Sequence, residues 1–152
     1  MTQSIWHTPL QLAPLNDRAL DGLSRHLGIE FIEFGHDHLT ARMPVAAHTY
    51  QPLGSLHGGA TAALAETVGS VAANCCVDPT VRFCLGLELN INHLKAVTAG
   101  FIHAVARPLH IGRTTQVWDI QIYNDEKKRI AVARLTIAVI KKIPPENQEG
   151  FI

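Results

Sequence analysis

Residues 58–76 read GGATAALAETVGSVAANCC, an apolar run typical of a helix, entered through Leu56 and His57. The run has no charged face, so we expect other elements to enclose it. Between Arg42 and Asp78 the only formally charged side chain is Glu66, in the middle of this run. A carboxylate buried without a partner costs several kcal/mol, so either a salt bridge to a distant Arg or Lys or a chemical role must account for it. We favour the chemical role.

The rest of the chain is dominated by strand-like patterns. Two β-rich runs, 29–34 and 38–43, flank a turn-like segment and predict a hairpin. Four more strand-like runs, joined by short turns, follow the helix at residues 83–94, 101–106, 113–123 and 129–140. Short turns between strands favour antiparallel pairing. Near the start, apolar residues from 15 to 27 recur at helical spacing and predict one helix that stops at Gly28.

The run 83–94 alternates in polarity. This predicts one face made of apolar residues (Leu85, Leu87, Leu89 and Ile91) and an opposite face with Glu88, Asn90 and Asn92. One long enclosed helix requires the sheet to curve around it. The predicted architecture is therefore α+β, a strongly bent antiparallel sheet wrapped around a central helix.

A chain of 152 residues fits one domain, which we expect to span 1–152 with a core at about 27–141 and a loose tail at 143–152. Charged residues make up only 17% of the chain, which indicates that oligomerisation hides further surface. The 13 basic and 13 acidic residues give no net field for nucleic acid. No unbroken apolar run is long enough for a membrane span, and the first residues do not resemble a signal peptide.

Three cysteines, Cys75, Cys76 and Cys84, lie in apolar surroundings and make an odd number. They are typical of reduced core residues, so we expect a cytoplasmic protein. The chain has no HExxH, paired CxxC, Walker, GxGxxG or G-x-S-x-G motif, so neither a metal site nor a serine hydrolase is predicted.

The start of the helix has the features of an anion or oxyanion site. The first backbone N–H groups of a helix lack intrahelical partners, and the helix dipole adds positive charge there. Gly58 and Gly59 have no Cβ, so a carbonyl oxygen could approach the backbone and be polarised. An equally good interpretation is that Gly58 and Gly59 only permit a tight turn into the helix.

Gly58 and Glu66 are eight residues apart, or roughly 12 Å along a helix axis. An attacking group and oxyanion donors must both lie about 3 Å from one reacting centre, so the two cannot meet within one helix. They meet if two copies of the helix run antiparallel in a two-fold dimer. If this chemistry exists, its sites therefore straddle a dimer interface.

The residues that carry these features resemble the hotdog-fold acyl-CoA thioesterases. The matching segments are 51–60 (QPLGSLHGGA), 65–70 (AETVGS), 87–94 (LELNINHL), 108–113 (PLHIGR) and 116–118 (QVW). The similarity covers roughly residues 27–141. It is to the branch of PaaI-like and Arthrobacter-type 4-hydroxybenzoyl-CoA thioesterases, near the bacterial 1,4-dihydroxy-2-naphthoyl-CoA thioesterases.

This resemblance implies hydrolysis of an aromatic or short- to medium-chain thioester of coenzyme A, or of an acyl carrier protein, by a dimer of dimers. It implies Glu66 as nucleophile or general base, Gly58 N–H helped by His57 as the donor that polarises the carbonyl, and Gln51 near the thioester. No cofactor is implied, because coenzyme A is part of the substrate. Contacts to the acyl group or the attacking water map to Thr67, Ser70 and His93. The coenzyme A cradle maps to Gly86, His93, Leu94 and Lys95, and to His110, Ile111, Gly112 and Arg113 in a loop.

Several alternatives stay open at this point. The Ser70 hydroxyl could instead bond to a carbonyl of its own helix, and His57 could simply brace the loop. On the same fold, the protein could be an acyl-CoA-binding module without turnover, or a hydratase or dehydratase.

Overall fold

The structure is a computed structural model that describes residues 4–19 and 21–143. Six strands form one antiparallel sheet in the order β1-β2-β4-β5-β6-β3. The strands are β1 (Glu30–Phe34), β2 (Leu39–Pro44), β3 (Arg82–His93), β4 (Phe101–Ile111), β5 (Thr115–Asn124) and β6 (Arg129–Lys141). The helices are α1 (Leu12–Ala19), α2 (Leu23–Leu27) and α3 (Gly58–Cys75), with a short 3-10 helix at Ala47–Thr49. The predicted tail lies, apart from Ile143, outside the described residues.

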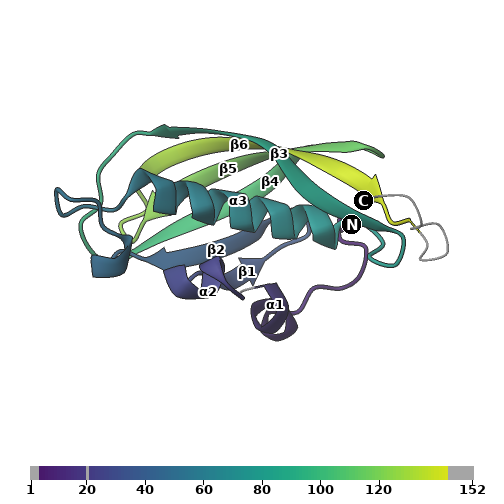
Figure 1. Ribbon diagram of the computed structural model, residues 1–152, viewed down its shortest axis with the longest axis horizontal. Helices are drawn as coiled ribbons and strands as arrows, with labels where there is room; N and C mark the ends of the chain where they lie inside the picture. The colour runs from purple at the N-terminus through teal and green to yellow at the C-terminus, as the bar shows by residue number, and fades with distance from the viewer. Residues whose placement is uncertain (1–3, 20, 144–152) are drawn as a thin grey trace, which may run out of the picture.

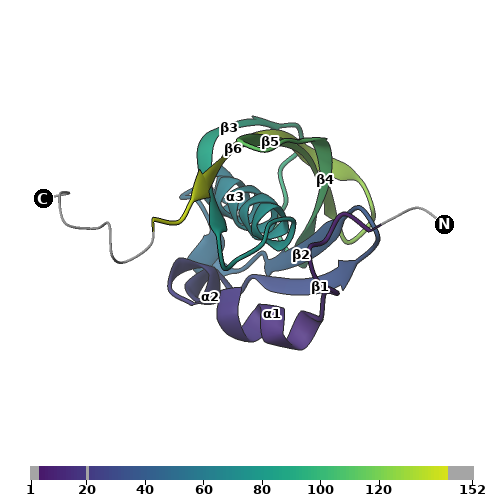
Figure 2. The same cartoon turned by 90° about the vertical axis from the view of Figure 1, so that its right-hand side faces the viewer.

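The sheet curves around α3 and encloses it, as Figures 1 and 2 show. The enclosed face of α3 is fully buried at Leu64, Ala65, Val68 and Ala72. Gly69 lets the sheet approach closely, since a Cβ there would lie 2.6 Å from a methyl group of Leu135. The predicted α+β architecture of a bent antiparallel sheet around one central helix is confirmed. None of the described helices is both long and apolar enough to cross a membrane.

The N-terminal helix prediction was wrong in one respect. The residues from 12 to 27 form two helices rather than one. Gly22, at the N-cap of α2, has φ 64° and ψ −126°, a positive-φ conformation that favours glycine and interrupts the helical path. The predicted stop is confirmed, because Gly28 ends α2 in the left-handed region with φ 71°. Beside β1, the Asn16 amide of α1 bonds to both the N–H and the C=O of Phe31, which covers part of this edge of the sheet.

The hairpin of β1 and β2 is confirmed, and β4 runs five residues further than predicted. The predicted strand ended at Ala106, whereas β4 continues through Pro108 to Ile111, with a register shift between Pro108 and His110. Pro108 lies beyond Ala106, where the pairing with β2 ends, and next to the register shift against β5; strands tolerate Pro at edges and at bulges. As a result His110 and Ile111 belong to a strand, and the predicted loop shrinks to residues 112–114.

The predicted apolar face of β3 was partly wrong. Leu85 and Leu87 are 52% and 64% exposed, whereas Leu89 and Ile91 pack against the core. The register against β6 shifts between Gly86 and Glu88, so Leu87 is the extra residue of a β-bulge. Because one extra residue exchanges the two faces of a strand, the side that faces α3 changes parity at the bulge.

A buried polar network joins β5 to the end of α3. The Gln116 side chain is fully buried. Its Nε2 donates to the Ala73 carbonyl at 3.4 Å, and its Oε1 accepts a 2.9 Å bond from the Trp118 indole N–H. The Trp118 ring is itself fully buried, so Gln116 is the group that satisfies the indole donor.

We expect Gln116→Leu to lower the free energy of unfolding by about 1–3 kcal/mol, because the buried Trp118 N–H would lose its acceptor. The Ala73 carbonyl would keep its hydrogen bond from the Cys76 N–H. Urea denaturation measures the difference. The control is Gln121→Leu, a half-buried glutamine further along the same strand. Equal losses in the two variants would contradict the assignment of this bond.

Candidate active site

Helix α3 begins at Gly58, and His57 is its N-cap. The His57 Nδ1 accepts a 2.8 Å hydrogen bond from the Gly59 N–H. In the neutral ring this bond places the proton on Nε2, which leaves a donor available to a ligand. None of the described residues accepts a hydrogen bond from the Gly58 N–H. One backbone donor and one imidazole donor are therefore both unused at the positive end of the helix.

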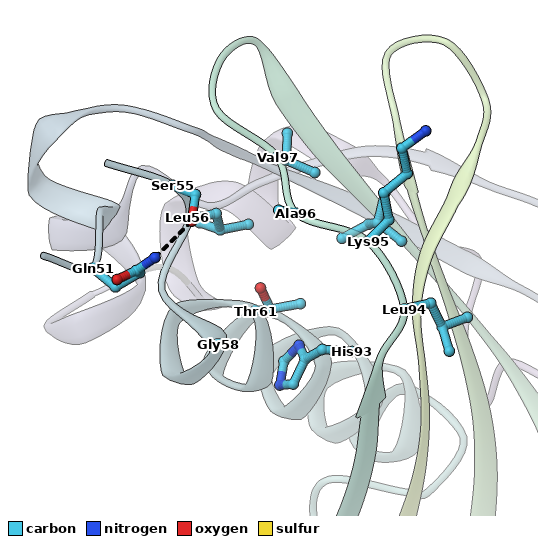
Figure 3. Close-up of a pocket in the computed structure, with 11 residues that line it drawn as sticks. Gln51, Ser55, Leu56, Gly58, Thr61, His93, Leu94, Lys95, Ala96 and Val97 are labelled. Atoms are coloured by element: carbon cyan, nitrogen blue, oxygen red, sulfur yellow. Dashed lines mark hydrogen bonds between the residues drawn. The ribbon is translucent and has the colours of Figure 1, made fainter. Parts of the chain in front are cut away.

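A pocket of about 430 Å³ opens beside this helix start (Figure 3). Its walls come from the approach loop, from the first turn of α3 and from the end of β3 with the segment after it. His93 lies against Gly58, since a Cβ on Gly58 would be 3.0 Å from the His93 Nε2. Two polar residues of the wall were missed from the sequence, Ser55 and Thr61. Thr61 could have been found, because it lies three residues after Gly58 on the same helix face.

Gln51 braces the approach loop at the rim of this pocket. Its Oε1 accepts from the Leu53 N–H at 2.8 Å, and its Nε2 donates to the Ser55 hydroxyl at 2.7 Å, the bond drawn in Figure 3. The amide carries two N–H bonds, so one donor remains after these contacts. The sequence-predicted residue therefore lines the pocket, with most of its hydrogen bonding directed into its own loop.

Glu66 is half-buried in the middle of α3. Its Oε1 accepts a 3.0 Å bond from the Ser70 hydroxyl, one turn later on the same face. Within the described part of the chain, no Arg, Lys or His forms a salt bridge with Glu66. A salt bridge therefore does not explain the presence of this carboxylate in the helix. Ser70 bonds to the carboxylate, whereas Thr67 faces α2, with its hydroxyl 3.4 Å from that of Ser24.

The sequence-predicted residues fall into two clusters in one protomer. The entrance cluster contains Gln51, His57, Gly58, His93, Leu94 and Lys95. The Glu66 cluster contains Glu66, Ser70 and Gly86. Thr67 follows Glu66 in the chain but faces α2. The residues His110, Ile111, Gly112 and Arg113 lie towards the same end of the sheet as Gly86. One turn of helix is about 5.4 Å, so the two clusters are separated by about two turns of α3.

The strands show the same separation. Within β3, His93 pairs with Ala131 at one end of β6, while Gly86 pairs with Ile137 towards the other. At about 3.3 Å per residue these two positions are roughly 20 Å apart. The turn at 112–114 lies at the Gly86 end, where Thr115 pairs with Ala138. One protomer therefore does not bring the two halves of the predicted coenzyme A cradle together.

The cysteines are free thiols, and burial raises their pKa to about 11 for Cys75 and Cys84 and about 12 for Cys76. They are protonated at neutral pH, as expected of inert thiols. Cys84 is a buried core residue as predicted, whereas Cys75 and Cys76 are only half-buried. Within residues 4–19 and 21–143, no three His, Cys, Asp or Glu side chains gather in a way that could hold a metal ion.

Comparison with known proteins assigns the chain to a family. Residues 53–131 match the model of the thioesterase superfamily. A putative esterase of Pseudomonas aeruginosa, PA1618, is 47% identical over 90% of this chain and 94% of its own length. The proofreading thioesterase EntH of Cronobacter turicensis is 43% identical, over 90% of this chain and 98% of its own.

Solved structures agree with this assignment. The crystal structure of a mutant of thioesterase PA1618 superposes with a TM-score of 0.90 at 45% identity, and the match covers 91% of this chain and all of that one. Both the sequence and the fold are thus shared over nearly the whole described chain. The protein belongs to the thioesterase superfamily and is a hotdog-fold thioester hydrolase.

Proposed function

We propose that this protein hydrolyses an acyl-CoA thioester, or the same acyl group on a carrier protein, with an aromatic or a short- to medium-chain acyl group. The observation that carries the proposal is Glu66, a carboxylate on an apolar helix that has a hydroxyl partner in Ser70 but no cation partner among the described residues. Such a group is suited to act as a nucleophile or a general base.

The active site would form between two protomers. Strand β3 is 12 residues long and lies at the edge of the sheet, with Leu85 and Leu87 exposed. A long apolar edge strand is normally paired or covered. If two β3 edges pair about a two-fold axis, two copies of α3 run antiparallel, and the Glu66 cluster of one protomer meets the entrance cluster of its partner. A further pairing of such dimers would give the dimer of dimers that the resemblance implies.

The chemistry follows from this arrangement. The thioester carbonyl oxygen accepts hydrogen bonds from the Gly58 N–H and the His57 Nε2–H, which stabilise the negative charge that forms on it. Glu66 of the other protomer attacks the carbonyl carbon or takes a proton from the water that attacks. The carbon–sulfur bond then breaks and the thiolate leaves. If Glu66 has attacked, water hydrolyses the acyl–Glu66 anhydride and regenerates the carboxylate. On either route water supplies the oxygen of the acid and the proton of the thiol. Lys95 and Arg113 would meet the phosphates of coenzyme A.

The branch within the superfamily is a finer proposal. The motifs around Glu66 and His93 resemble the Arthrobacter-type and 1,4-dihydroxy-2-naphthoyl-CoA enzymes. The similarity to a proofreading thioesterase, EntH, supports thioester hydrolysis and makes a carrier-protein thioester a substrate to include in tests.

A thiol-release assay over a panel of substrates tests the proposed function. The panel contains benzoyl-CoA, hexanoyl-CoA, a long-chain acyl-CoA and one acylated carrier protein. We expect the highest kcat/KM for a benzoyl or hexanoyl thioester. No thiol release from any member, with tight acyl-CoA binding, would indicate a binding module instead. Water addition to an enoyl-CoA without thiol release would indicate a hydratase.

The two roles of His57 can be separated by substitution. His57→Ala removes both the N-cap and the Nε2 donor, so we expect a loss of about 0.5–2 kcal/mol in stability as well as slower hydrolysis. His57→Asn retains an N-cap acceptor but does not reach the carbonyl, so stability should hold while kcat falls about 10²-fold, as for other oxyanion donors. Thermal unfolding and steady-state kinetics measure the two effects. Wild-type kcat in His57→Asn would assign His57 a bracing role alone.

A further inference from the structure

Gly86 of β3 lies directly against the Glu66 carboxylate. A Cβ built on Gly86 would overlap Glu66 Oε1 and would lie 3.1 Å from Cδ and 3.4 Å from Oε2. The carboxylate therefore occupies the volume that any side chain at position 86 would fill. Glu66 Oε1 also accepts a hydrogen bond from the Ser70 hydroxyl, at 3.0 Å. Glu66 is thus placed between a hydroxyl of its own helix and the bare backbone of the edge strand.

The backbone does not itself require glycine at this position. The described glycines with positive φ are Gly22, Gly28, Gly54 and Gly100, and Gly86 is not among them. An alanine could adopt the same backbone conformation without strain. The space taken by the carboxylate is therefore the reason that the structure offers for a residue without a side chain.

The β-bulge at Leu87 lets β3 contribute residues to both the Glu66 cluster and the entrance cluster. Before the bulge at Leu87, Cys84 and Gly86 face α3; after it, Leu89, Ile91 and His93 do. With regular alternation through residue 87, Glu88, Asn90 and Asn92 would face α3 instead. One extra residue thus lets a single strand present Gly86 to Glu66 and His93 to Gly58. Figure 2 shows β3 alongside α3 at the open end of the curved sheet.

We propose that Gly86 is a positioning residue, whose missing side chain holds the Glu66 carboxylate against the β3 edge, where it faces the thioester bound at the partner's helix start. This inference rests on the proposed role of Glu66, and it changes the role of Gly86 from a cradle contact for coenzyme A to a support for the attacking group. A Cβ at this position would push the carboxylate aside. A displacement of about 1 Å at a reacting group can cost about 10²-fold in rate.

A double-mutant cycle between positions 86 and 66 tests the proposal. We expect Gly86→Ala to lower kcat for the best thioester of the panel about 10²-fold, with KM within about threefold of wild type, because the acyl-CoA contacts are unchanged. In a Glu66→Asp background the carboxylate is one methylene shorter and withdraws from β3. There Gly86→Ala should cost less than about threefold in kcat, which is the non-additivity expected of residues in contact.

Asn90→Ala, on the outer face of the same strand, is the control and should leave kcat unchanged. The inference would be overturned if Gly86→Ala lowered kcat by the same factor in both backgrounds. It would also be overturned if Gly86→Ala left kcat unchanged in the wild-type background. If Gly86→Ala fails to fold, recovery of the folded protein by Glu66→Asp supports the contact, and failure to recover contradicts it. A wild-type enzyme that releases no thiol would refute the proposed function itself. Additive effects of the two substitutions would instead refute only the role of Gly86.

Discussion

Replacing Glu66 by Gln should lower kcat for the best thioester substrate about 10²–10⁴-fold, the range over which a positioned acid or base contributes to catalysis. The amide keeps the volume of the side chain, and its oxygen can still accept the hydrogen bond from Ser70. It is neither a base nor a useful nucleophile. The binding of substrate depends on other residues, so KM should change little.

Steady-state thiol release and thermal unfolding of Glu66→Gln measure this prediction. The matched control is Glu88→Gln, an exposed carboxylate on β3 that faces away from α3. Glu88→Gln should retain wild-type kcat. Hydrolysis by Glu66→Gln within a few-fold of wild type would remove Glu66 from the mechanism, whatever the fold.

Mixing two inactive variants should restore activity. A chain with Glu66→Gln has an intact entrance cluster, and a chain with His57→Asn has an intact Glu66. If each site takes one part from each chain of a two-fold dimer, random assembly gives an intact site in about one quarter of cases, since each chain must be of the right type with a probability of one half. Activity should therefore rise from background to about a quarter of the wild-type value.

Co-expression of the two chains at equal levels with the same affinity tag, followed by purification on that tag and thiol-release assays, measures this recovery. The control pairs Glu66→Gln with the double variant Glu66→Gln/His57→Asn, which offers no intact combination and should stay at background. If the site lies within one chain, every chain in the mixture is defective and the mixture stays inactive. That result would refute the proposed site between protomers.

The limits of sequence interpretation are clearest in β3. Alternation in the sequence placed Leu85 and Leu87 on the same face as Leu89 and Ile91, yet the bulge leaves the first two exposed. A bulge is set by the pairing of two strands, here β3 with β6, and a single strand carries no information about its partner's register. The same reason applies to β4, because the end of the pairing with β2 at Ala106 and the register shift against β5 at Pro108 are both properties of strand pairs.

The candidate site was predictable only as a set of residues. Glu66 and the Gly58 entrance were found because a charge in an apolar helix and a Gly-Gly pair at a helix start are local patterns. Their spacing along one helix also showed that they could not meet in one chain. The contacts that orient them, Ser70 to Glu66 and Gly59 to His57, depend on side-chain geometry that spacing alone leaves open.

The amino-acid sequence by itself determined which residues form α3, that this helix is enclosed, and that a curved antiparallel sheet encloses it. These properties follow from hydrophobic periodicity, which is a local property of the chain. Only the tertiary structure decided that Gly86 faces the Glu66 carboxylate and that His93 faces Gly58. Both contacts depend on Leu87, the unpaired residue between β3 and β6. Strand register is a relation between segments that are distant in sequence, and neither segment encodes it alone.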